Sequence, residues 1–167
     1  MPLISVSHLE KVYESDGVKT HALAEATFDI EKGEFVSIMG PSGSGKSTLM
    51  QVLGLLDRAT AGRYLLEGRD IGGFDDDTLA LFRNKKIGFV FQAFNLLPKT
   101  TVFENVELPL LYDDQMMEDN NARVDAALAA VGMSHRAAYF SNQLSGGEKQ
   151  RVAIARALVN DPEIIFA

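Results

Sequence analysis

The sequence contains no cysteine, no excess of positive charge and no long apolar run. The absence of cysteine excludes disulfides and thiolate metal sites and suits a reducing compartment. Its 16 basic and 23 acidic residues give a formal net charge of −7, which disfavours non-specific nucleic-acid binding. No apolar run approaches the ~20 residues that cross a bilayer, and no basic segment leads into an apolar one at the start of the chain. We therefore expect neither a membrane span nor a signal peptide.

What the chain does contain is typical of a soluble globular protein. It has 167 residues, of which 46% are hydrophobic and 23% charged. A chain of this size and composition can bury the core of one domain.

Residues 40–47 read Gly-Pro-Ser-Gly-Ser-Gly-Lys-Ser, with an apolar run at 35–39 before them and a helix-forming stretch at 48–56 after them. A strand, a glycine-rich loop and a helix in this order are the context of a phosphate-binding loop. The glycines let backbone N–H groups point inward, and the start of the helix adds further donors. Lys46 can reach the β- and γ-phosphates, and the Ser47 hydroxyl can bind Mg²⁺. The alternative, a glycine-rich turn, does not account for the flanking pattern.

Coarse periodicity predicts an α/β organisation for the rest of the chain. Strands are expected at 3–13, 26–30, 35–39, 64–66, 87–91 and 163–167, and helices at 48–56, 78–84, 101–111, 118–131 and 148–160. The continuous apolar run at 87–91 is typical of a strand buried in a parallel sheet. No strand pattern interrupts residues 92–144, which therefore indicate a helical insertion.

A second motif precedes the last predicted helix. Ser145 and Glu148 have the spacing of a capping box, in which each side chain satisfies a free backbone N–H group. Gly146 and Gly147 between them lower helix stability and favour a bare helix start, which attracts anions. Together with the loop at 40–47, this motif indicates a nucleotide held between two surfaces.

The loop at 40–47, combined with Leu-Ser-Gly-Gly-Glu-Lys-Gln-Arg at 144–151, resembles the ATP-binding subunit of ABC transporters over the whole chain. Gln is commoner in the family at the position of Glu148. The segments at 54–57, 83–97 and 104–110 are most similar to the branch that contains lipoprotein-releasing (Lol-type) and macrolide-exporting (Mac-type) ATPases, with a cell-division ATPase nearby.

The resemblance implies an α/β fold of the P-loop NTPase (RecA-like) type. It implies an N-terminal antiparallel β region, an inserted α-helical subdomain and an incomplete central sheet. It further implies a single ATP-binding domain over 1–167. Within it, an α/β core with the β region would cover 1–91, the helical subdomain 92–144, and the signature helix with the start of the next strand 145–167.

The resemblance also implies ATP and Mg²⁺ as ligands. Tyr13 would stack on adenine, Lys46 would neutralise phosphate charge, and Ser47 would hold Mg²⁺. The residues that would wrap the phosphates are Gly40, Pro41, Ser42, Gly43, Ser44, Gly45, Lys46, Ser47 and Thr48. Gln92 would touch Mg²⁺ and the attacking water and relay contact to the membrane subunits.

The signature motif would act between two subunits. Ser145 and Gly147, with Gly146 and Glu148 beside them, would contact the γ-phosphate of ATP held by the other subunit of a head-to-tail dimer. The implied partners are membrane permease subunits, with no nucleic acid, and the implied location is the cytoplasmic face of the inner membrane. The transported cargo is not encoded in this chain.

In the family, an Asp, a Glu that acts as general base and a later His follow the position of Ala167. His8, His21 and His135 all lie upstream of that position. We therefore expect a C-terminally truncated ATPase subunit that binds ATP weakly or with little turnover.

Three other functions compete with this one. A nucleotide-dependent interaction module of a cell-division complex would share every motif and differ only in its partner. An ABC ATPase acting on DNA or the ribosome is disfavoured by the negative charge, the lack of zinc-binding cysteines and the short helical insertion. A small GTPase or kinase is disfavoured because residues 84–87, Asn-Lys-Lys-Ile, lack the Asp that reads guanine, and because neither fold explains residues 144–151.

Overall fold

The computed structural model describes residues 1–112 and 119–167. The chain forms two compact units, residues 1–79 and 80–167, and each is described by itself. The helix α2 (Asp76–Lys86) runs across the boundary between them. Within the described residues, no helix is both long enough and apolar enough to cross a membrane. The functional subdivision predicted at residues 91 and 144 stays a prediction.

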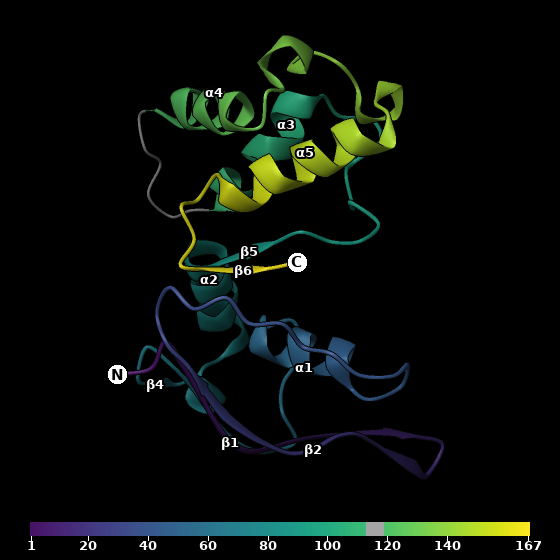
Figure 1. Ribbon diagram of the computed structural model, residues 1–167, viewed down its shortest axis with the longest axis vertical. Helices are drawn as coiled ribbons and strands as arrows, with labels where there is room; N and C mark the ends of the chain where they lie inside the picture. Colours follow the sequence, from purple (N-terminus) through teal and green to yellow (C-terminus); the bar gives the residue numbers. More distant parts are fainter. Residues whose placement is uncertain (113–118) are drawn as a thin grey trace. The chain divides into compact units, whose positions relative to one another are not determined.

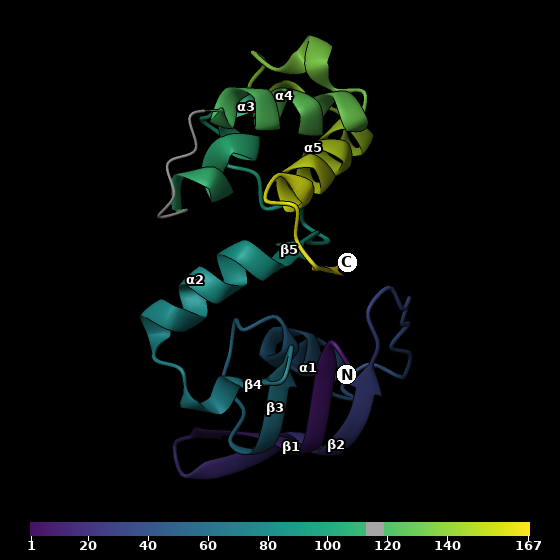
Figure 2. The same ribbon diagram turned by 90° about the vertical axis from the view of Figure 1, so that its left-hand side faces the viewer.

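The first unit contains a four-stranded antiparallel sheet in the order β2-β1-β3-β4 (Figure 2). Its strands are β1 (Ile4–Ser15), β2 (Val18–Ile30), β3 (Ala61–Leu66) and β4 (Arg69–Asp70). Asp16 and Gly17 both have positive φ, 52° and 78°, which suits a two-residue hairpin turn. The predicted strands at 3–13 and 64–66 are confirmed. β2 begins at Val18, well before the predicted residue 26. The prediction missed its first half because that half is largely exposed and lacks an apolar pattern.

The helix α1 (Lys46–Leu53) lies against this sheet (Figures 1 and 2). Val52 and Leu53 are buried, and the hydroxyl of Tyr64 on β3 donates a hydrogen bond of 2.8 Å to the Leu53 carbonyl oxygen. The helix was predicted at 48–56; it begins two residues earlier and ends before Leu55, which has a left-handed φ of 58°.

The strand predicted at 35–39 is not formed. Phe35 and Met39 are 95% and 87% exposed, and among the described strands none pairs with this segment. A strand exists only where a neighbour accepts and donates its backbone hydrogen bonds. An apolar run predicts the tendency of a segment to become buried, but it does not supply that neighbour.

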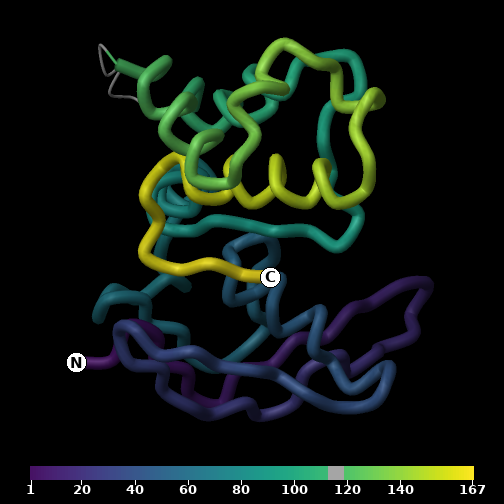
Figure 3. Tube along the Cα trace, turned by 45° about the horizontal axis from the view of Figure 1, so that its top comes forward, coloured from purple at the N-terminus to yellow at the C-terminus, as the bar shows by residue number. Residues whose placement is uncertain are grey.

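The second unit contains a parallel pair, β5 (Ile87–Phe89) and β6 (Ile164–Phe166), in the register Ile87↔Ile164. Figure 3 shows these two segments running side by side although they are far apart in the sequence. The strands predicted at 87–91 and 163–167 are confirmed, each shorter than expected, and the parallel setting that the apolar run at 87–91 indicated is present. A Cβ at Gly88 would lie 2.4 Å from the Ala157 carbonyl oxygen, so α5 (Gly146–Leu158) packs very closely on β5.

The helices α3 (Val102–Glu107), α4 (Asn120–Ala130) and α5 enclose the apolar core of this unit (Figure 1). Val106, Leu128 and Val152 are fully buried where these helices meet. The helix predicted at 101–111 changes at Leu108 to a 3₁₀ helix, because Pro109 cannot donate an α-helical hydrogen bond. The predicted start at Glu118 lies outside the described residues. The 3₁₀ helices are η1 (Ile71–Gly73), η2 (Leu108–Tyr112), η3 (Ser134–Arg136) and η4 (Ser141–Gln143).

Candidate nucleotide-binding site

The loop of residues 40–47 leads directly into α1, and Gly45 determines how closely it packs. Gly45 has a φ of +85°, in the region that favours glycine. A Cβ at this position would lie 2.4 Å from the carbonyl oxygen of Ala22 on β2. A side chain here would therefore strain the backbone and collide with the sheet. The loop lies against β2 at a distance that requires glycine.

Lys46 folds back over this loop. Its Nζ donates hydrogen bonds of 2.6 Å to the Pro41 carbonyl oxygen and 3.3 Å to Ser44 Oγ. The ammonium group of Lys46, which is the first residue of α1, is thus held back over the loop. Both acceptors are neutral, so an anion at this point would compete with them successfully for the cation.

The start of α1 is open to an anion. Its N-cap, Gly45, makes no side-chain hydrogen bond, and its first turn contains no acidic residue. The first-turn N–H groups have no partner within the helix, and the helix dipole adds partial positive charge there. Ser47 and Thr48 place hydroxyl groups in the same turn. Loop, lysine and helix start therefore fit a phosphate group.

The donors near the loop also decide how a divalent cation could bind. The described residues contain no cluster of three or more His, Cys, Asp or Glu side chains arranged for a metal. Mg²⁺ commonly binds through one or two protein oxygens and the phosphates of its ligand. The Ser47 hydroxyl together with phosphate oxygens fits that mode, so the site suits a metal that arrives with a nucleotide.

Tyr13 lies on β1, and the residue is 40% exposed. Its hydroxyl donates a 2.7 Å hydrogen bond to Asp57 Oδ2, in the turn that follows α1. This bond raises the pKa of Tyr13 above its ordinary value, aided by partial burial and the negative charge of Asp57, whereas a hydrogen bond with the Thr48 side chain acts in the opposite direction. The structure thus brings Tyr13 together with the end of the phosphate loop.

Gln92 is exposed in a turn after β5. The loop that follows it is held by α5: the Arg156 guanidinium donates hydrogen bonds of 2.8 Å to the Phe94 carbonyl oxygen and 2.7 Å to that of Asn95. Both acceptor residues have left-handed φ angles, 61° and 50°. Burial lowers the pKa of Arg156. The predicted Gln92 therefore sits at one end of a loop that is tied to the signature helix.

The start of α5 is closed by its own side chains. Ser145 Oγ and the Ser145 backbone N–H both donate to Glu148 Oε2 at 2.8 Å, and the capping box is complete. These bonds lower the pKa of Glu148, with a smaller contribution from the charge of Arg136, whose Nε lies 3.3 Å from Oε1. The prediction of a bare helix start is therefore wrong in part, because the Glu148 carboxylate caps the start of α5.

The glycines of this motif have no internal reason to be glycine. A Cβ at Gly146 would meet nothing within 4 Å, and one at Gly147 would only touch the end of the Arg151 side chain at 3.8 Å. Glycine costs helix stability relative to alanine. The open space above these residues therefore suits the close approach of a molecule outside this chain.

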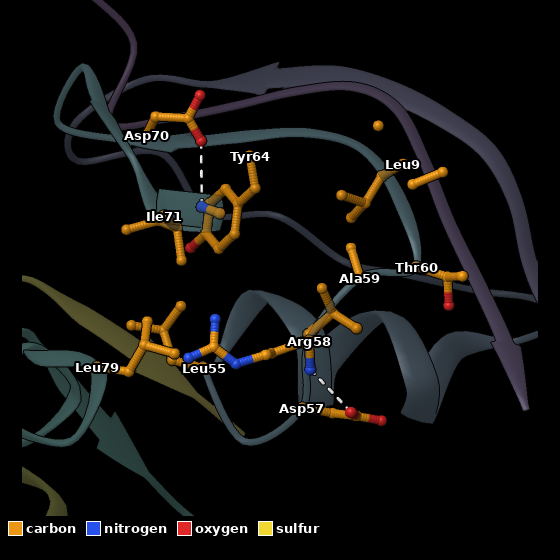
Figure 4. Close-up of a pocket in the computed structure, with 14 residues that line it drawn as sticks. Leu9, Leu55, Asp57, Arg58, Ala59, Thr60, Tyr64, Asp70, Ile71 and Leu79 are labelled. Carbon is orange, nitrogen blue, oxygen red and sulfur yellow. Dashed lines mark hydrogen bonds between the residues drawn. The ribbon is translucent and has the colours of Figure 1, made fainter. Parts of the chain in front are cut away.

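A separate cavity of about 210 Å³ lies in the first unit (Figure 4). Leu9, Leu55 and Ile71 are among the residues that line it, together with the charged residues Asp57 and Arg58. None of the residues 40–48 lines it. The cavity is therefore not the phosphate site.

Sequence reasoning missed four residues that hold predicted site residues in place, two in each unit. Lys11 and Asp57 hold Tyr13, and Arg136 and Arg156 hold Glu148 and the loop after Gln92. Their partners lie far along the chain, 46 residues away for Lys11 and Asp57 and 62 for Arg156 and Phe94. Local patterns carry no signal for such pairs.

Comparison with known proteins decides the family. The sequence profile described as ABC transporter matches residues 23–167 of this chain. The chain belongs to the ABC transporter family. It is 48% identical over 165 residues to the uncharacterized ABC transporter ATP-binding protein YknY of Bacillus subtilis, covering 99% of this chain and 72% of that protein.

Two further relatives place this ABC chain more closely. It is 49% identical to the macrolide export ATP-binding/permease protein MacB of Rhodospirillum rubrum, of which it spans 26%. Among solved structures, the ATP-binding cassette MJ0796 in a dimeric post-hydrolysis state with ADP and Pi is 44% identical, with a TM-score of 0.88 over 97% of this chain and 72% of that one. The expected P-loop NTPase fold is thereby confirmed.

Proposed function

We propose that this chain is the ATP-binding subunit of an export-type ABC transporter and that residues 40–48 hold the phosphates of Mg-ATP. The observation that carries the proposal is the open start of α1, with Lys46 held across it by neutral acceptors. On binding, Lys46 would exchange these acceptors for phosphate oxygens, and Ser47 would contribute its hydroxyl to Mg²⁺. Such a site works by positioning and charge stabilisation.

The second half of the proposal is a head-to-tail dimer. Ser145 and Gly147 would contact the γ-phosphate of ATP held by another copy. Gln92 would contact the Mg²⁺ and the attacking water at the ATP that its own copy binds. The open space above Gly146 supports this arrangement, because nothing in the chain itself requires glycine there. The related cassette MJ0796 is dimeric in its solved structures.

The partner would be a membrane permease, and the chain would lie peripherally at the cytoplasmic face of the membrane. The support is the likeness to MacB proteins, whose name joins an ATP-binding part to a permease. ATP hydrolysis would be coupled to movement of a cargo that the permease selects.

Ligand-linked stability tests the phosphate site. At a Mg-ATP concentration ~100 times the dissociation constant, binding to the native state adds about 2.7 kcal/mol to the free energy of unfolding. We expect this gain in the wild-type chain and not in Lys46→Ala; the matched control Lys85→Ala should keep it. An equal gain in all three chains would contradict the proposed site.

A further inference from the structure

The Tyr13 side chain is fixed by a closed set of interactions with two charged residues. Asp57 Oδ2 accepts the hydrogen bond from the Tyr13 hydroxyl, and Asp57 Oδ1 lies 2.6 Å from Lys11 Nζ. The same ammonium group lies 4.8 Å from the centroid of the Tyr13 ring. Lys11 and Asp57 therefore hold both the end and one face of the ring.

Each of the two charged residues is itself anchored. Lys11 Nζ also donates to the Arg58 carbonyl oxygen at 2.8 Å, and its side chain is only 12% exposed. Asp57 Oδ1 accepts the Arg58 backbone N–H at 2.7 Å, the bond drawn dashed in Figure 4. Partial burial raises the pKa of Asp57, but the hydrogen bonds from Lys11 and Tyr13 outweigh it and keep the carboxyl ionised.

This arrangement ties β1 to the turn that follows α1, the helix that begins at the phosphate loop. An aromatic ring binds a base by stacking, and an immobilised ring loses less entropy when it does so. With one ring face under an ammonium group and the residue still 40% exposed, the ring is suited to stack a flat ligand on its other face.

We propose that Lys11 and Asp57 are positioning residues that hold Tyr13 as the platform for the adenine of ATP. The inference rests on the proposed function, because it assumes that the phosphates occupy residues 40–48. It assigns to this pair a role in binding the base and none in binding the phosphates.

Two ligands separate these contributions: Mg-ATP, and inorganic tripolyphosphate with Mg²⁺, which lacks the base. Calorimetric titration would give both dissociation constants for the wild-type chain, Lys11→Met, Asp57→Ala and Tyr13→Ala. We expect ATP affinity to fall about two- to tenfold in the first two variants, the range for one side chain no longer pre-ordered. Tripolyphosphate affinity should stay unchanged, which also shows that the variants remain folded.

Matched variants sharpen the test. Lys19→Met removes the same charge from the same hairpin, where Lys19 lies 3.9 Å from Glu14, and should leave both affinities unchanged. Asp57→Asn keeps an acceptor for Tyr13 and should recover part of the ATP affinity. Tyr13→Phe keeps the ring but loses the hydrogen bond, so it probes the fixation of the ring even if Asp57→Ala fails to fold.

The outcomes are distinct. Equal losses for ATP and tripolyphosphate, or no loss for either, would overturn the positioning role. Unchanged ATP affinity in Tyr13→Ala would overturn it as well, while leaving the phosphate site intact. If the wild-type chain bound neither ligand, the proposed function would fail, and this inference with it.

Discussion

The two helix starts that sequence analysis linked to phosphate are built in opposite ways. α1 begins after a glycine that offers no cap, with a lysine folded over its first turn. α5 begins after Ser145 and is closed by Glu148, a carboxylate that Arg136 partly neutralises. The comparison teaches that the start of α1 is open to the phosphate that we propose there, whereas an anion at α5 would have to approach a helix start that already carries a carboxylate.

The largest effect is expected when the close packing of Gly45, at the start of α1, against Ala22 is disturbed. Gly45→Ala should cost more than the about 1–3 kcal/mol of a strained φ alone, because the added Cβ also meets the Ala22 carbonyl oxygen, and it should abolish Mg-ATP binding. Urea unfolding and ATP titration measure the two effects. Gly17→Ala is the control: its φ of +78° is similar, but its Cβ meets nothing within 4 Å. Equal costs in both variants would show that the contact with Ala22 is unimportant.

Removing the N-cap side chain of α5, Ser145, should have a smaller effect. Ser145→Ala should destabilise the chain by about 1 kcal/mol, the usual value of a lost N-cap. Ser145→Asn retains an acceptor and should restore most of the stability in urea unfolding. Both variants lose the hydroxyl, so both should weaken ATP-driven dimerisation, measured by light scattering. A dimer that forms normally with Ser145→Asn would contradict a direct role of the hydroxyl.

A substitution at Gly146, which begins α5, should raise stability and not lower it. Gly146→Ala should stabilise the chain by up to about 1 kcal/mol, because its Cβ meets no atom and alanine favours the helix. The same change should weaken dimerisation with Mg-ATP. Gly73→Ala, also in open space, controls for a general effect of losing a glycine. Stronger dimerisation by Gly146→Ala would reverse our interpretation of that surface.

The smallest effect concerns pH. The native pKa of Glu148 lies below its ordinary value of 4.5, so its ionised form stabilises the native state above that value. This contribution is lost as the pH falls through the lowered pKa. The stability difference between the wild-type chain and Glu148→Gln should therefore be constant near neutral pH and shrink below pH 4.5, as urea midpoints would show. Thr101 and Glu104 form a capping box at the start of α3, and no arginine contributes to the lowered pKa of Glu104. Glu104→Gln should therefore give a smaller difference.

The elements that sequence analysis predicted correctly depend on local chemistry. The order of glycines, lysine and helix at 40–53 follows from residues that are neighbours in the chain, and the capping box at 145–148 has its own spacing. The segment at 35–39 could not be predicted in the same way, because a strand depends on a partner elsewhere. The environment of Tyr13 could not be predicted either, because Lys11 meets Asp57 only after the sheet and α1 have packed.

The hydrogen bonds from Arg156 to the loop after Gln92 depend on the backbone of that loop and not on its side chains. The guanidinium binds main-chain carbonyl oxygens, which every amino acid at positions 94 and 95 would present. The attachment of the loop to the signature helix therefore does not depend on the identity of these side chains, which are restricted instead by the left-handed φ angles at both positions. Through Arg156, α5 and residues 94–95 are joined by two hydrogen bonds. A displacement of α5 that kept these bonds would therefore move residues 94 and 95 with it.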